Sequence, residues 1–187
     1  MTDTQSRTTV STWTIDPSHS HVEFAVKHMM FTTVRGSFER LSGTIRLDEA
    51  NVANSSVEVE IEAASISTRD EKRDAHLRSA DFFDVERYPT ITFRSTRVEP
   101  VGENRLKVTG DLTMHGVTRE VVLDTEFTGR GKSPFGFEVL GYTATTTINR
   151  DEFGLTWNAA LETGGVLVGN EIKITIDVEA IPAESQG

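Results

Sequence analysis

The sequence has 187 residues, with 29 acidic and 19 basic side chains, a formal net charge of -10 and no cysteine. Disulfides, thiolate metal sites and cysteine nucleophiles are therefore excluded. A surface of this charge repels nucleic acid and anionic lipid headgroups. The polar N-terminus has no signal-peptide pattern, and no stretch reaches the ~18 apolar residues of a membrane span. We expect a cytoplasmic protein without stable membrane insertion.

Apolar and polar residues alternate along most of the chain. The alternation runs through 22–28, 57–63, 90–95, 106–109, 121–127 and 172–179, and 142–148 is rich in threonine. In 57–63 three glutamates share one face and two valines and an isoleucine share the other, the period of a half-buried strand. Turn signals separate these runs, among them Gly36, Gly116 and Gly164. The pattern predicts an all-β fold of antiparallel strands, a sandwich or a barrel.

The segment 68–79 departs from this period because it is charged and rich in helix formers. Thr68 is followed three residues later by Glu71, a capping-box spacing that predicts a short helix beginning at Thr68. The segment 79–84 ends the helix and places Phe82 beside Phe83. We expect the helix to plug one barrel end, with a lid over an entrance as the alternative.

The whole chain is predicted to form one domain over residues 1–187. No composition shift or linker divides it. The ordered core is expected over about 12–181, with frayed residues before and after it.

Two histidines and a glutamate make the only metal-like motif. His19, His21 and Glu23 lie on one strand face, a candidate His-x-His-x-Glu ligand set. The apolar residues between them form the opposite face, so the three side chains point outward, where no dry cavity holds an ion. We expect solvated or hydrogen-bonded histidines and no metal site.

The other histidines differ in their expected surroundings. His28 shares the apolar face of its strand, so it points inward. It is either a core histidine bonded to a carbonyl or hydroxyl or a polar group that fixes one end of a ligand. His115 lies in a hairpin turn, and His76 is expected on the exposed side of the charged helix.

Catalytic signatures are weak throughout. The sequence has no Gly-x-Ser-x-Gly elbow and no phosphate-binding glycine loop, so no catalytic residue is predicted. Its ten phenylalanines fall mostly in or beside apolar runs. In a small barrel such rings either fill the core or line a cavity for one ligand.

Four stretches in order resemble the YceI-like family, from Trp13 to Ala180. They are 13–28 with 34–38, 79–84 leading to 88–93, 110–118, and 148–155. The resemblance implies an antiparallel lipocalin-like barrel of about eight strands with one short helix. It further implies that the barrel holds a polyisoprenoid or similar long-chain lipid, with no other cofactor, and that the chain forms a homodimer.

The resemblance also implies a set of ligand-binding residues. These are Phe24, Val26, His28, Phe38, Phe82, Phe83, Phe93, Ile148, Arg150 and Phe153. Phe24 and Val26 would line the interior and His28 would meet a headgroup near one end. Arg150 occupies the arginine position of the family motif, and a structural pairing with Asp151 or another carboxylate is its alternative role.

Two other functions compete with a lipid carrier. One is an enzyme that acts on an apolar substrate in the same cavity, with His28 as acid or base. The other is a packed interaction module without a cavity.

Overall fold

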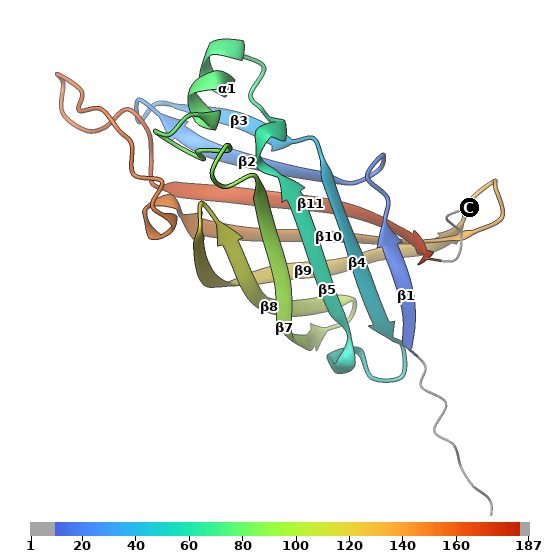
Figure 1. Ribbon diagram of the computed structural model, residues 1–187. Helices are drawn as coiled ribbons and strands as arrows, with labels where there is room; N and C mark the ends of the chain where they lie inside the picture. The colour runs from blue at the N-terminus through green and yellow to red at the C-terminus, as the bar shows by residue number, and fades with distance from the viewer. Residues whose placement is uncertain (1–9, 184–187) are drawn as a thin grey trace, which may run out of the picture.

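The computed structural model describes residues 10–183 (Figure 1). Within this range the chain forms antiparallel strands, one α-helix and three 3-10 helices. In chain order they are β1 (Val10–Ile15), β2 (His21–His28), β3 (Thr32–Phe38), β4 (Leu41–Asp48), η1 (Val52–Asn54), β5 (Ser56–Glu62), η2 (Ala63–Ser65), β6 (Ile66–Ser67), α1 (Glu71–Arg78), β7 (Thr90–Gly102), β8 (Arg105–Met114), β9 (Val117–Lys132), β10 (Glu138–Asn149), η3 (Arg150–Phe153) and β11 (Glu171–Pro182).

The strand segments of residues 10–183 combine into eight barrel strands. β1 and β2 follow one another along β11, where Ile15 pairs with Ala180 and His21 pairs with Asp177. β3 and β4 lie along β6 and β5 in the same way. Pairing of β1 with both β4 and β11 closes the sheet. The predicted all-β, eight-strand antiparallel barrel with one short helix is thereby confirmed.

Period-two alternation places apolar side chains inside the barrel. Glu58 and Glu60 are exposed on β5, whereas Val57 and Val59, which alternate with them, pack against the core. Gly36, predicted to mark a turn, instead lies within β3 opposite Phe24. The ring of Phe24 occupies the space that a Cβ of residue 36 would need. Gly36 is therefore a strand residue that makes room for an inward ring.

The helix starts later than the capping-box pattern predicted. α1 begins at Glu71, and the side chain of Asp70 caps it by accepting a hydrogen bond of 3.0 Å from the backbone N–H of Arg73. Thr68 is not the cap because its hydroxyl donates to buried Asp74 at 2.6 Å and accepts from Arg73 Nε at 2.7 Å. These bonds hold Thr68 in the connection between β6 and the helix.

Helix α1 closes one end of the barrel (Figure 1). Arg78 Nε donates to the carbonyl oxygen of Ala64 at 3.0 Å, and Leu77 packs against the core below the helix. The main core cluster fills this half of the barrel and includes Phe38, Ile66 and Phe153, each less than a tenth exposed. The helix therefore acts as a plug rather than as a lid over open space.

The frayed ends that the sequence predicts lie mostly at residues 1–9 and 184–187, outside the described residues. Val10 and Ser11, also expected to fray, instead pair with β4 as part of β1. Of the helices in residues 10–183, none is long and apolar enough to cross a membrane.

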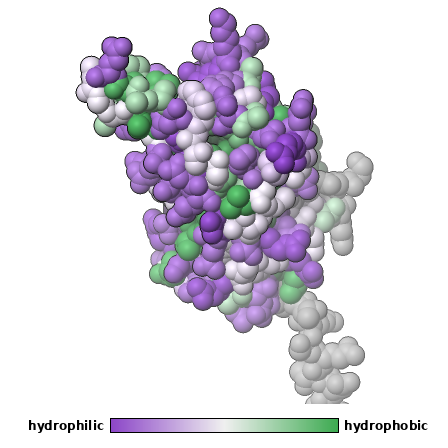
Figure 2. All heavy atoms as spheres, turned by 60° about the vertical axis from the view of Figure 1, so that its left-hand side comes forward, coloured by the Kyte–Doolittle hydropathy of each residue, from purple (hydrophilic) through white to green (hydrophobic). Residues whose placement is uncertain are grey.

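The surface seen in Figure 2 is largely hydrophilic. Large apolar side chains nevertheless gather at the β2–β3 hairpin tip, where Met30 is 61% and Phe31 81% exposed. The backbone N–H of Met29 donates to the carbonyl oxygen of Leu167 at 2.7 Å. This bond ties the hairpin tip to the segment 158–169, which projects from the barrel in Figure 1.

Candidate functional site

An apolar cavity of about 110 Å³ occupies the barrel half remote from α1. Its wall is made mainly of aliphatic side chains from eight strands, together with η1 and the residue that follows it. The lining residues are Ile15, Ile45, Leu47, Val52, Ser55, Ser56, Val57, Val59, Phe93, Val98, Leu106, Val108, Leu123, Thr125, Tyr142, Ala144, Ile176 and Val178. A site of this composition suits a ligand with a hydrocarbon surface.

The predicted site residues fall into different parts of the molecule. Phe93 lines the cavity. Phe38, Ile148 and Phe153 belong to the core that fills the other half, and Phe24 and Phe83 pack against it. The rings of Phe24 and Phe38 lie 5.7 Å apart, as do those of Phe38 and Phe83. The structure thus brings these five together as a packed cluster, separate from the cavity wall.

Phe82 stands in a small aromatic cluster near the helix. Its ring centroid lies 5.3 Å from Trp157 and 5.1 Å from His76, and His76 lies 4.6 Å from Trp157. The imidazole of His76 also shares a 2.9 Å hydrogen bond with Asp81. His76 was expected to be exposed, but these ring contacts leave it half-buried.

Val26 and His28 lie toward the end of β2, away from the cavity. Val26 is half-buried opposite Val34 of β3. His28 is half-buried and forms an isolated bridge with Val168. Neither side chain is among the residues that line the cavity.

Arg150 is buried and holds the backbone of the segment that follows it. Its guanidinium donates to the carbonyl oxygens of Leu155 at 2.6 Å, Gly169 at 2.8 Å, Trp157 at 2.9 Å and Val168 at 3.3 Å. Burial lowers the pKa of Arg150, while Asp151 acts in the opposite direction. Four of its five N–H donors are engaged, so the side chain has the contacts of a structural residue.

His19 meets two carboxylates on the outer surface, but they are not the predicted partners. Its Nδ1 lies 3.0 Å from Asp16 Oδ2 and 3.8 Å from Glu179 Oε2. The hydrogen bond to Asp16 is the main cause of the raised pKa of His19 and of the lowered pKa of Asp16. His21 and Glu23, the other members of the predicted set, are exposed on β2. The contacts of His19 are those of a hydrogen-bonded surface histidine.

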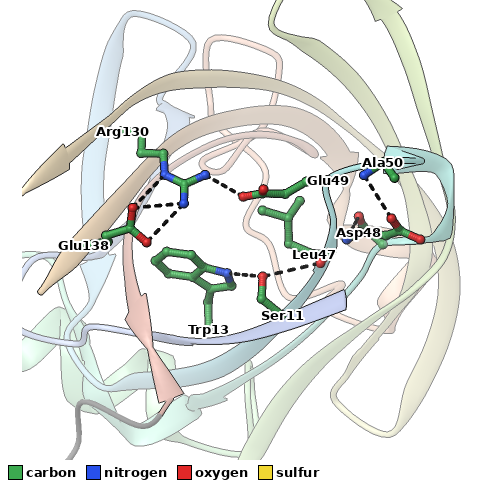
Figure 3. A network of polar contacts seen from close by, with 9 residues as sticks. Ser11, Trp13, Leu47, Asp48, Glu49, Ala50, Arg130 and Glu138 are labelled. Atoms are coloured by element: carbon green, nitrogen blue, oxygen red, sulfur yellow. Dashed lines mark hydrogen bonds and ion pairs between the residues drawn. The ribbon is translucent and has the colours of Figure 1, made fainter. Parts of the chain in front are cut away.

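A charged cluster lies at the mouth of the barrel, beyond the cavity (Figure 3). Arg130 of β9 binds Glu138 of β10 through Nε and Nη2, at 3.0 to 3.2 Å, and binds Glu49 through Nη1. Its guanidinium carbon stands 5.8 Å from the ring centroid of Trp13. We call Glu49, Arg130 and Glu138 the charged collar.

Trp13 separates the charged collar from the cavity. The Trp13 indole N–H donates to Ser11 Oγ at 2.8 Å, which fixes the ring (Figure 3). Its cluster packs against Leu47, Tyr142 and Val178, which also line the cavity. Burial raises the pKa of Tyr142, Glu49 raises it further and Arg130 opposes the shift. Tyr142 is therefore in electrostatic reach of the collar and in contact with the cavity.

Sequence reasoning missed most of the cavity wall because it searched among the phenylalanines. The signal was present in the alternating runs, whose apolar faces supply Val57, Val59, Val108, Ile176 and Val178. The collar had no local signal for Glu49, because this residue after β4 meets Arg130 from 81 positions away, whereas Arg130 and Glu138 face each other across the β9–β10 hairpin.

A closed antiparallel barrel around an apolar cavity defines the class of this protein, and comparisons place it within that class. The chain belongs to the YceI-like family, whose domain model matches residues 13–180. A UPF0312 protein of Staphylococcus aureus (strain N315) is 40% identical over 171 residues, which cover 91% of this chain and 97% of that protein.

Solved structures support the same assignment. BcnA of Burkholderia cenocepacia matches with a TM-score of 0.78 and 25% identity over 88% of this chain and 98% of that one. The YCEI protein of Campylobacter jejuni matches with a TM-score of 0.70 and 33% identity, over 83% of this chain and 88% of that one. A polyisoprenoid binding domain from Saccharophagus degradans shares the fold, with a TM-score of 0.65 and 15% identity over 91% of this chain and 98% of that one.

Proposed function

We propose that this protein binds a polyisoprenoid or similar long-chain amphiphile inside the barrel and carries it without chemical change. The apolar cavity beside the filled core is the observation that carries the proposal. The fold shared with a polyisoprenoid binding domain supports the same ligand class.

The size of the cavity sets a condition on this proposal. At about 110 Å³ it is smaller than the ~300–1,000 Å³ of ordinary small-molecule pockets. A chain of several isoprene units must therefore widen it by displacing wall side chains. Burial of each CH₂ group of the ligand contributes about 0.8 kcal/mol to the binding free energy. Each five-carbon unit can therefore offset part of the free energy needed to displace the wall side chains and to order the lipid tail.

Binding without catalysis is favoured by the cavity lining. Among its described residues the polar groups are the hydroxyls of Ser55, Ser56, Thr125 and Tyr142, and carboxylates and imidazoles do not contribute. A general acid or base is thus not placed at the wall. His28, the residue that the enzyme alternative requires, lies elsewhere.

Native mass spectrometry of the purified protein, followed by organic extraction, tests the proposal. We expect about one molecule of a long-chain lipid to co-purify with each protein molecule. If none does, the protein should take up added prenyl alcohols, and its affinity for them should rise as the tail lengthens from two to four isoprene units. Protein that carries no lipid and refuses these alcohols would refute the carrier function. Release of a chemically altered alcohol would instead support the enzyme.

The homodimer expected from the family resemblance is part of the same proposal. Sedimentation equilibrium with and without the bound alcohol measures it directly. A protein that stays monomeric at all concentrations would refute the homodimer but not the carrier function.

A further inference from the structure

The charged collar limits the kind of headgroup that a bound amphiphile can carry. This inference rests on the proposed function. The barrel half near α1 is filled by the main core cluster, so a hydrocarbon tail in the cavity has no exit there. The polar end of such a ligand must then lie toward the mouth. One layer of side chains, Trp13, Leu47 and Tyr142, stands between the cavity and the collar.

The charged collar contains two carboxylates and one guanidinium. Arg130 is held by two carboxylates, with bidentate bonds to Glu138 and a further bond to Glu49. Asp48, the last residue of β4, is buried, and its Oδ1 accepts from the backbone N–H groups of Ala50 and Asn51 (Figure 3). Lys132 lies opposite Glu138 in the β9–β10 register. The guanidinium of Arg130 is already engaged by two carboxylates.

An anionic headgroup would have to compete for a guanidinium that is already engaged. A phosphate or carboxylate must displace Glu49 or Glu138 from Arg130 and leave that carboxylate unpaired near the new charge. An uncharged hydroxyl meets no such obstacle, because it can donate to a free lone pair of either carboxylate while the ion pairs stay intact.

We propose that the charged collar makes this barrel selective for amphiphiles with an uncharged hydroxyl end, such as prenyl alcohols or prenyl phenols, over prenyl phosphates and fatty acids. Glu49, Arg130 and Glu138 are thus specificity-determining residues. The collar acts through repulsion of the wrong headgroup rather than through added attraction for the right one.

The test compares two ligands that differ only in the headgroup, farnesol and farnesyl monophosphate, by titration calorimetry on the full chain. We expect the alcohol to bind about tenfold more tightly, the ratio that a modest charge repulsion produces at a partly hydrated site. In Glu49→Gln combined with Glu138→Gln, Arg130 is released to meet an anion, and the preference should disappear or reverse.

The control removes the same two charges from the outer surface. Glu60→Gln combined with Glu171→Gln changes exposed residues of β5 and β11 and should keep the preference for the alcohol. Thermal melts confirm that both double variants are folded. If the double variant of the collar does not fold, Glu49→Gln alone still frees one guanidinium donor. It should then reduce the ratio of the affinity for farnesol to that for farnesyl monophosphate.

The outcomes separate this inference from the proposed function. Equal binding of both ligands by the unaltered protein, or a preference that survives in the collar variant, would overturn the selectivity and leave the carrier standing. Binding of neither ligand would instead count against the carrier itself.

Discussion

At the scale of single residues, Gly110 of β8 shows how closely the barrel interior is packed. A Cβ built at this glycine would lie 2.5 Å from the carbonyl oxygen of Arg94 and 2.5 Å from Cζ of Phe93. The backbone cannot yield, and Phe93 can move only into the cavity. We expect Gly110→Ala to lower the unfolding free energy by about 1–3 kcal/mol, the usual range for overpacking.

Chemical denaturation of Gly110→Ala beside Gly129→Ala measures this effect. Gly129 on β9 is the matched control, because a Cβ there meets nothing within 4 Å. A loss of the same size in both variants would show that backbone freedom, and not contact with Phe93, makes the glycine necessary.

Tyr142 offers a second prediction at this scale, on pH dependence. Burial, reinforced by Glu49, raises the pKa of its hydroxyl above the ordinary value near 10. A folded-state pKa above the unfolded one means that the neutral form is stabilised on folding, so stability is retained below pH ~10 and lost as pH rises further. We expect a late-titrating component of tyrosinate absorbance that Tyr142→Phe removes. Its persistence in that variant would assign it to another residue.

At the scale of elements, Arg150 organises the long connection between η3 and β11. Its four bonds to carbonyl oxygens replace the strand pairing that residues 155–169 largely lack. We expect Arg150→Met to cost about 3 kcal/mol or more, because buried carbonyls lose charged donors. Amide hydrogen exchange should quicken in this segment first.

The control for this prediction is Arg94→Met on β7. Arg94 is 75% exposed and its ion pair with Glu58 is worth less than about 1 kcal/mol. If Arg150→Met destabilises the protein no more than Arg94→Met, the buried network does not hold the segment.

The elements that could be predicted from sequence are those with a local cause. Alternation specifies a strand by itself, so the inward and outward faces of β5 and β11 were predictable. The helix start was misplaced because Asp70 caps the helix, while the Thr68 hydroxyl bonds to Asp74 and Arg73 instead of to the backbone N–H groups of the first turn. Gly36 was misassigned because its cause is not local: a Cβ there would collide with the ring of Phe24 on the neighbouring strand and with the side chain of Thr68.

At the scale of the whole molecule, the position of the cavity depends on side-chain volumes summed over eight strands. The large rings of Phe24, Phe38, Phe83 and Phe153 fill the half near α1, whereas shorter aliphatic side chains around η1 leave space. The sequence therefore predicted the class of site but not the end of the barrel that holds it. That difference between the halves follows from packing, which no single segment encodes.

Filling the cavity tests whether this space is where a ligand binds. Ala144 is buried on β10 and lines the cavity, so Ala144→Leu adds three carbons to its interior. We expect the melting temperature to stay level or rise by a few degrees, because filling empty volume is stabilising at about 24 cal/mol per Å³. Affinity for a prenyl alcohol should fall at least about tenfold, since the added side chain competes with the hydrocarbon tail.

Thr145→Leu makes a matched control for this last experiment. Thr145 is exposed on the outer face of the same strand, so the same new side chain leaves the cavity unchanged and should leave affinity unchanged. If leucine overpacks the interior and lowers stability, Ala144→Val adds less volume and should still weaken binding in proportion. Full affinity in a stable Ala144→Leu variant would place the hydrocarbon tail outside this cavity, and the barrel would then be a packed support for a site on its surface.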